Sequence, residues 1–173
     1  GTYYLKLQAR SGGSYTTDQY SLTQTFTAGN ASSFESESNN TVSTADALTL
    51  GSPIKGQVSS STFDYLGNVV GDVDYYKFTT SSSGSVSITL DSPLPSDTLY
   101  EYYFSVTLYD SNNNNLGLYE TGTDLTASLG IPSAGTYYLK LQARSGGSYT
   151  TDQYSLTQTF TAGNASSFES ESN

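Results

Sequence analysis

The sequence predicts an all-β protein, an antiparallel, jelly-roll-like β-sandwich of about eight strands. Composition is the first reason, because the chain contains 16 Tyr and 7 Phe but few charged residues. Aromatic and β-branched residues favour strands, and long helical patterns of apolar residues are missing. The second reason is a series of short alternating segments separated by turn signals about every 8–12 residues, which is typical of sandwiches.

A stretch that occurs twice without a difference predicts the domain organisation. Residues 1–39 and 135–173 have the same sequence, so the repeat period is 134 residues. That period is the size of a whole domain, far above the roughly 20–50 residues of solenoid repeats. We therefore expect a tandem array of nearly uniform modules. The predicted divisions are residues 1–28, the C-terminal hairpin of a preceding identical module; 29–33, a linker; 34–161, one complete module; and 162–173, a linker and the start of the next module.

The first predicted elements are two strands of a hairpin. Residues 2–8 alternate, with Leu5 and Leu7 on one face, and residues 19–26 alternate around Leu22. A Gly-rich turn joins them. A hairpin alone is at best marginally stable in water, so these strands need further partners.

The complete module contains the remaining predicted strands. Residues 45–50 form either one helical turn or an extended segment, and a polar loop follows Val58. Alternation in residues 72–79 directs Tyr76 and Phe78 into the core. The predicted strands of this module are residues 54–58, 72–79, 85–90, 102–109, 116–119, 125–129, 135–142 and 153–160.

Charge and missing residue types exclude several classes of function. The formal net charge is −10, which repels phosphate backbones and anionic lipid, so we expect neither a nucleic acid nor a membrane as partner. The chain has no His and no Cys, which excludes Ser-His-Asp and Cys-His nucleophiles, disulfides and thiolate metal sites. Carboxylate pairs such as Asp72 with Asp74, or Asp110 with Glu120, lack any sign of the cleft that a glycosidase needs. We therefore expect no enzyme.

Two motifs carry a resemblance to a known family. These are Asp-Tyr-Tyr-Lys-Phe at residues 74–78 and Gly-Thr-Tyr-Tyr-Leu at residues 135–139. With the pattern around them, residues 35–156 resemble the bacterial pre-peptidase C-terminal domain and are similar to its relative, the collagen-binding domain of clostridial collagenases. The resemblance implies a β-sandwich of about this size, non-catalytic, carried by secreted or surface proteins of bacteria as a targeting or spacing module.

The resemblance also implies a calcium site. In the collagen-binding relatives, a Glu-x-Glu-x-Asn-Asp segment binds calcium against the loop before Asp-Tyr-Tyr. The corresponding candidate ligands here are Glu35, Glu37, Asn39, Asn40, Asp72 and Asp74. Calcium takes six to eight oxygen ligands from carboxylates and carbonyls, so these residue types suit it. Asn40 stands where the family has Asp, and the loop between Val58 and Gly71 is longer than in the collagenase relatives. The alternative interpretation is a solvated acidic linker.

Exposed tyrosines and sequons are weaker candidates. Tyr4, Tyr75, Tyr102 and Tyr138 could form a platform for a sugar or a protein, although cross-strand pairing that stiffens one face is the favoured interpretation. Asn30 and Asn39 each open a glycosylation sequon, a short pattern with many false positives.

Two functions follow from these patterns. The first is a calcium-stabilised extender module of a bacterial surface adhesin or extracellular matrix fibre, whose partners are adjacent identical modules in the same or neighbouring chains. The second is a targeting module that attaches a secreted hydrolase to collagen, polysaccharide or another extracellular polymer.

Because residues 1–26 are identical to residues 135–160, we also expect that they can complete the sandwich of a neighbouring chain by strand exchange. In a longer polypeptide the same segment would belong to the preceding module.

Overall fold

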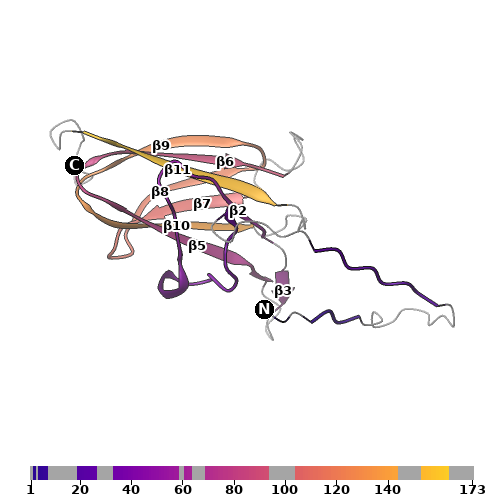
Figure 1. Cartoon of the computed structure of the whole chain (residues 1–173). Coiled ribbons are helices and arrows are strands. Elements are labelled where there is room, and N and C mark those ends of the chain that lie inside the picture. Colours follow the sequence, from indigo (N-terminus) through magenta and orange to yellow (C-terminus); the bar gives the residue numbers. More distant parts are fainter. Residues whose placement is uncertain are drawn as a thin grey trace.

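Two β-sheets packed face to face form the body of the protein (Figure 1). The computed structural model describes residues 2, 4–7, 19–26, 33–58, 61–63, 69–93, 104–143 and 153–163. The five-stranded sheet has the order β1 (Asp46–Ala47), β5 (Val73–Thr80), β10 (Gly135–Ala143), β7 (Phe104–Tyr109) and β8 (Asn115–Thr121). The four-stranded sheet has the order β2 (Ile54–Gly56), β11 (Tyr154–Ala162), β6 (Gly84–Asp91) and β9 (Leu125–Ile131). These nine strands confirm the predicted β-sandwich.

The core lies between the two sheets and follows the predicted alternation. In β5, alternate residues are buried, among them Tyr76 and Phe78. In β6 the buried row is Val86, Ile88 and Leu90, each 0% exposed. Full burial of such a side chain stabilises the fold by about 1.5–3 kcal/mol. The other apolar residues of the core are Ile54, Val58, Phe104, Val106, Leu108, Ile131, Tyr137, Leu139, Leu141, Tyr154 and Leu156.

The local structure resolves one alternative of the sequence prediction and adds two features to it. Residues 45–50 take the extended alternative, because β1 pairs with β5 there, and this pairing is parallel in an otherwise antiparallel sheet. A short 3₁₀ turn, η2 (Val42–Thr44), precedes it. The predicted polar loop after Val58 contains a separate antiparallel pair, β3 (Ser61–Phe63) and β4 (Val69–Gly71). Three-residue strands are below the length at which alternation is recognisable in a sequence.

The two identical stretches adopt different structures. In the C-terminal copy, β10 and β11 are paired strands, as predicted. In the N-terminal copy, the described residues 2, 4–7 and 19–26 form no strand and extend away from the sandwich (Figure 1). The predicted strands at residues 2–8 and 19–26 are therefore wrong for the described residues. A strand needs a neighbour to satisfy its backbone donors and acceptors, and the positions between β5 and β7 and between β2 and β6 are taken by the second copy.

One end of the sandwich is crossed by the segment that opens the module. Phe34 forms an isolated bridge with Lys55, and the Glu35 amide donates to the Lys55 carbonyl at 2.9 Å. The Tyr75 amide donates to the Asn39 carbonyl, also at 2.9 Å, so the segment is attached to both sheets. In the part of the chain that the structure describes, no helix has the length and apolar character to cross a bilayer.

Candidate metal centre

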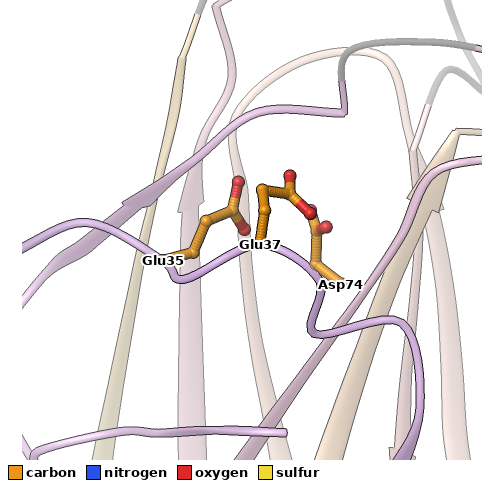
Figure 2. Close-up of side chains that lie close together, drawn as sticks. All are labelled: Glu35, Glu37 and Asp74. Atoms are coloured by element: carbon orange, nitrogen blue, oxygen red, sulfur yellow. The ribbon is translucent and has the colours of Figure 1, made fainter. Parts of the chain in front are cut away.

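Three carboxylates converge where the opening segment meets the end of the sandwich. One carboxylate oxygen each from Glu35, Glu37 and Asp74 lies within 4.8 Å of the others (Figure 2). Asp74 is the first member of the inward row of β5, so the alternation that buries Tyr76 also buries this acid, which is 0% exposed. Glu35 and Glu37 come from the opening segment, where Glu35 is half-buried and Glu37, which lies at a bend, is exposed.

Glu35 is held by hydrogen bonds from both sheets. Its Oε1 accepts the Gln57 amide at 2.6 Å. Its Oε2 accepts the Tyr76 hydroxyl at 2.7 Å and the Tyr154 hydroxyl at 3.2 Å. Because Tyr76 belongs to β5 and Tyr154 to β11, this one carboxylate is fixed against both layers of the sandwich.

A chain of hydroxyl contacts joins Glu35 to Asp74. Tyr76 contacts Glu35, Tyr154 lies 2.6 Å from Asp74 Oδ2, and the hydroxyls of Tyr76 and Tyr154 contact each other. Together with the contact of Tyr154 to Glu35, four oxygen–oxygen contacts join these four groups, whereas the two hydroxyls supply only two protons. A proton on one carboxyl group would allow a third of these contacts to be a hydrogen bond. The geometry therefore fits a state in which one of the two acids is protonated.

The pKa values agree with that proton count. Burial, followed by the charge of Glu35, raises the pKa of Asp74 to about 9. Burial also raises the pKa of Glu35, although hydrogen bonds led by that from Tyr76 oppose the shift. Burial and then the charges of Asp72, Glu35 and Asp46 raise the pKa of Glu37 to about 7. Like charges in a partly desolvated site favour protonation, and a bound cation would favour the ionised forms instead.

Asn39 contributes a second kind of oxygen to the site. It is 0% exposed, and its Nδ2 donates to Glu35 Oε2 at 3.3 Å and to Asp46 Oδ2 at 3.4 Å. With the amide nitrogen assigned in this way, Oδ1 is an acceptor, and it finds no hydrogen-bond donor among the described residues. Asp74 Oδ1 is likewise buried without a donor in the described part of the chain. Burial also closes Asn39 to glycosylation in the folded module.

The remaining predicted ligands, Asp72 and Asn40, are not among the three converging carboxylates. Asp72 is half-buried and acts on Glu37 and Asp74 through its charge, although it is outside the converging set. Asn40 is exposed. The structure therefore brings together Glu35, Glu37, Asp74 and Asn39, with Asp72 nearby.

Three residues of the site escaped the sequence analysis. Asp46 accepts the Ser36 amide at 2.7 Å and the Ser36 hydroxyl at 2.6 Å, which folds the opening segment back on itself. Tyr76 was predicted only as a core residue, and Tyr154 only as part of the strand at residues 153–160. A buried tyrosine hydroxyl needs a polar partner, and the proximity of Tyr76 to Asp74 in the sequence was the available signal.

Gly56 gives Tyr154 and Glu35 the room to meet. Gly56 pairs with Tyr154 across β2 and β11. A Cβ at this position would lie 2.1 Å from the Tyr154 hydroxyl and 2.6 Å from Glu35 Oε2. Any side chain at Gly56 would therefore displace groups of the site.

The donor set suits a hard divalent cation. Three carboxylates and a buried amide oxygen are the ligand types that calcium takes, and buried acceptors without donors are otherwise costly. The cluster could also exist as the protonated, hydrogen-bonded group described above. A cation in this position would substitute for the shared proton and would bind the opening segment to β5.

The predicted exposed tyrosines divide between two places. Tyr75 and Tyr138 lie on the outer face of the five-stranded sheet, where Tyr138 is opposite Tyr109 in the register. Tyr109, the cross-strand neighbour of Tyr138, was not in the predicted set. Tyr4 is 89% exposed in the N-terminal copy, and Tyr102 lies outside the described residues.

Part of the chain matches a known protein family, and several solved structures are similar to it. Similar solved structures include the pre-peptidase C-terminal domain of a collagenase from Bacillus anthracis (20% identity, TM-score 0.48, covering 66% of this chain and 93% of that one). Another is the K3 cleaved adhesin domain of Lys-gingipain from Porphyromonas gingivalis (14% identity, TM-score 0.35, covering 59% and 71%). No curated protein matches the chain. Residues 72–143, which contain β5 to β10 and Asp74, match the family model of the bacterial pre-peptidase C-terminal domain.

Proposed function

We propose that this chain is a non-catalytic, calcium-stabilised module of the pre-peptidase C-terminal type. It acts as an extender in a bacterial surface adhesin or extracellular fibre. The main supporting observation is the cluster of Glu35, Glu37 and Asp74, in which Asp74 is buried, Glu35 is half-buried and Glu37 is exposed, and which joins the opening segment to the sandwich. The identical stretches at residues 1–39 and 135–173 support a tandem array. The family match at residues 72–143 supports an extracellular location.

Calcium at this position would set the direction in which one module leaves the next. The opening segment follows the linker of residues 29–33, so a cation that bridges Glu35 and Glu37 to Asp74 would fix the first residues after the linker. Fixing these residues removes conformational freedom between modules and stiffens an array. Strand exchange between neighbouring chains, which would join modules without a covalent link, is part of the same proposal.

A thermal melt in EDTA and in millimolar calcium tests the cation. At a calcium concentration 100-fold above Kd, binding adds about 2.7 kcal/mol to the free energy of unfolding. For a module of this size we expect Tm to rise by about 10 °C. The variant Glu35→Gln, Glu37→Gln, Asp74→Asn should lose this rise.

A charge-matched variant provides the control. Asp91→Asn, Glu120→Gln, Asp124→Asn removes three exposed carboxylates elsewhere and should keep the calcium response. Equal melts of the unaltered chain with and without calcium would overturn the cation, and the extender role would then depend on the repeat alone.

The alternative function is a targeting module of a secreted hydrolase that binds collagen or a polysaccharide. The outer face of the five-stranded sheet favours it, because Tyr75, Tyr109 and Tyr138 alternate there with Lys77 and Lys140. Aromatic rings flanked by amines are suited to contacts with polymers that have apolar and polar groups.

A further inference from the structure

We propose that the N-terminal copy, through residues 4–7 and 19–26, is a second closing hairpin that completes the sandwich of another copy of this chain. In that complex, Tyr20 of the second copy takes the place of Tyr154 beside Asp74. The candidate cation site then contains residues of two chains. This inference rests on the proposed function, whose strand exchange is tested by sedimentation and trapping and whose cation is tested separately by the calcium melts.

The same side chains are buried in one copy and exposed in the other. Leu139 and Leu156 are 0% exposed, whereas the equivalent Leu5 and Leu22 are 72% and 62% exposed. Tyr154 is 1% exposed and its equivalent Tyr20 is 74% exposed. A run of large apolar side chains left in water is typical of a surface that binds a partner.

The position that such a segment would fill is central to the fold. β10 lies between β5 and β7 in one sheet, and β11 lies between β2 and β6 in the other. The closing hairpin thus supplies an interior strand to each sheet. Because the N-terminal copy has the same sequence, it can make the same backbone pairs and fill the same core positions.

The linker favours another chain over the same one. Phe34 is attached beside Lys55, which pairs with Ser155 near the start of β11. The end of that strand, Ala162, is seven residues away, about 23 Å along an extended strand. Residue 28, the equivalent of Ala162, is joined to Phe34 by six residues that span at most about 22 Å. Filling its own sandwich would therefore stretch the linker to its full length and leave no slack for the step from β11 to the neighbour of Lys55.

A chain with an intact C-terminal copy keeps its own hairpin in dilute solution. Its own copy is present at an effective concentration in the millimolar range, so a second chain competes only when neighbours are similarly concentrated. Adjacent copies in a fibre meet that condition. Donation from one chain to the next is head to tail and does not close, so it extends into a filament.

In the exchanged complex, the candidate cation site would contain groups from two chains, so cation binding would be coupled to assembly. The Tyr154 hydroxyl lies 2.6 Å from Asp74 Oδ2 and 3.2 Å from Glu35 Oε2. A donated hairpin would place the Tyr20 hydroxyl at these distances. The acceptor chain supplies the carboxylates and the donor chain supplies the tyrosine.

Disabling one copy at a time tests the exchange. In Leu139→Asp, Leu156→Asp the chain's own hairpin cannot enter the core, and we expect a folded protein whose sedimentation coefficient rises with concentration. The matched variant Leu5→Asp, Leu22→Asp should remain a monomer with an unchanged melt, and the variant with all four substitutions should be unfolded. The proposal fails if Leu139→Asp, Leu156→Asp is as unfolded as the fourfold variant, or is folded but monomeric at every concentration.

Disulfide trapping tests the predicted register. Thr157 pairs with Thr89 across β11 and β6, and Thr23 is the equivalent of Thr157. In the Leu139→Asp, Leu156→Asp background, Thr23→Cys with Thr89→Cys should give a ladder of interchain disulfides on a non-reducing gel. In the unaltered background, Thr157→Cys with Thr89→Cys should give a disulfide within one chain. An oxidised sample without the ladder would contradict donation by residues 19–26.

A reciprocal pair of tyrosine variants tests the shared cation site. In the assembled Leu139→Asp, Leu156→Asp background, Tyr20→Phe should change the calcium-induced rise in Tm and Tyr154→Phe should not. In the unaltered chain the two effects should be reversed. A response that follows Tyr154 in both backgrounds would overturn the shared site. If calcium changes neither melt, the proposed cation fails, and sedimentation and trapping still decide the exchange.

Discussion

Asp74 shows how one position can combine a structural and a chemical role. Its place in the inward row of β5 forces the carboxyl out of water, and burial is the main reason that its pKa rises to about 9. The acid is retained at low cost only when a proton or a cation compensates its charge. The hydroxyls of Tyr76 and Tyr154 form hydrogen bonds that stabilise the site when it is protonated. The oxygens of Glu35, Glu37 and Asn39 are suited to ligating a cation when the site is ionised.

The pH dependence of stability should distinguish these two forms. In EDTA, the folded chain keeps a proton on Asp74 up to about pH 9, whereas the unfolded chain loses it near the ordinary aspartate pKa of 3.8. The folded state then binds more protons, so the free energy of unfolding should fall as pH rises from about 4 to 9. Glu37, with a pKa of about 7, adds to this fall between about pH 4.5 and 7. Urea unfolding at pH 5.5 and pH 8.5 measures the effect.

The control for this experiment is Asp74→Asn, which removes the main titration and should flatten the dependence. It also separates the effect of this site from that of electrostatic self-repulsion. In a chain with a net charge of −10, self-repulsion also lowers the free energy of unfolding as pH rises. Saturating calcium should reverse the trend, because its ligands bind only when ionised. Stability that increases with pH in EDTA would contradict the protonated form.

At the scale of elements, the two copies of the hairpin are an internal comparison. Local propensity and alternation are identical in both, yet only β10 and β11 are strands among the described residues. The difference is the set of neighbours, which supply backbone partners and cover the apolar face. Strand formation here is a property of the sheet as much as of the segment.

Leucine truncation in each copy measures this difference directly. Leu156→Ala should lower the free energy of unfolding by about 2–5 kcal/mol, because a fully buried leucine leaves a cavity. Leu22→Ala is the same change in the same local sequence and should stay within about 0.5 kcal/mol, because the side chain is exposed. Urea denaturation at low protein concentration, where exchange between chains is suppressed, provides both values. Equal costs would mean that the N-terminal copy is also packed in solution.

At the scale of the whole molecule, charge is distributed unevenly. Sixteen acidic residues exceed six basic ones, and the acidic cluster occupies the end of the sandwich from which the opening segment enters. Lys77 and Lys140 lie on the outer face of the five-stranded sheet, opposite Tyr138 and Tyr75 in the register. The module thus has one end suited to a cation and one face suited to a polymer.

Co-sedimentation with fibrillar collagen and with an insoluble polysaccharide separates the two proposed roles. The extender role predicts that the chain stays in the supernatant with both polymers, because its partners are other modules. Retention that is lost in Tyr109→Ala, Tyr138→Ala would favour the targeting role instead. Tyr4→Ala, which removes an exposed tyrosine outside the sandwich, is the matched control.

Much of the fold was predictable because alternation is a local property. The rows that contain Phe78 or Ile88 follow from period-two patterns, and the bounds of β5, β6, β9 and β10 agree with the predictions to within one or two residues. The short strands β3 and β4 could not be predicted, because three residues are too few to show an alternating pattern. The candidate ligands came from a family pattern, whereas Asp46, Tyr76 and Tyr154 joined the site through contacts between segments distant in sequence.

The sequence by itself determined which side chains can face a core, which oxygens are available for a cation, and that the chain contains one closing hairpin twice. Only the tertiary structure decided which copy becomes part of the sheets and which acids meet. The physical reason is the same in both cases. Strand pairing and the convergence of charges depend on partners far along the chain, and two identical sequences differ in nothing except those partners.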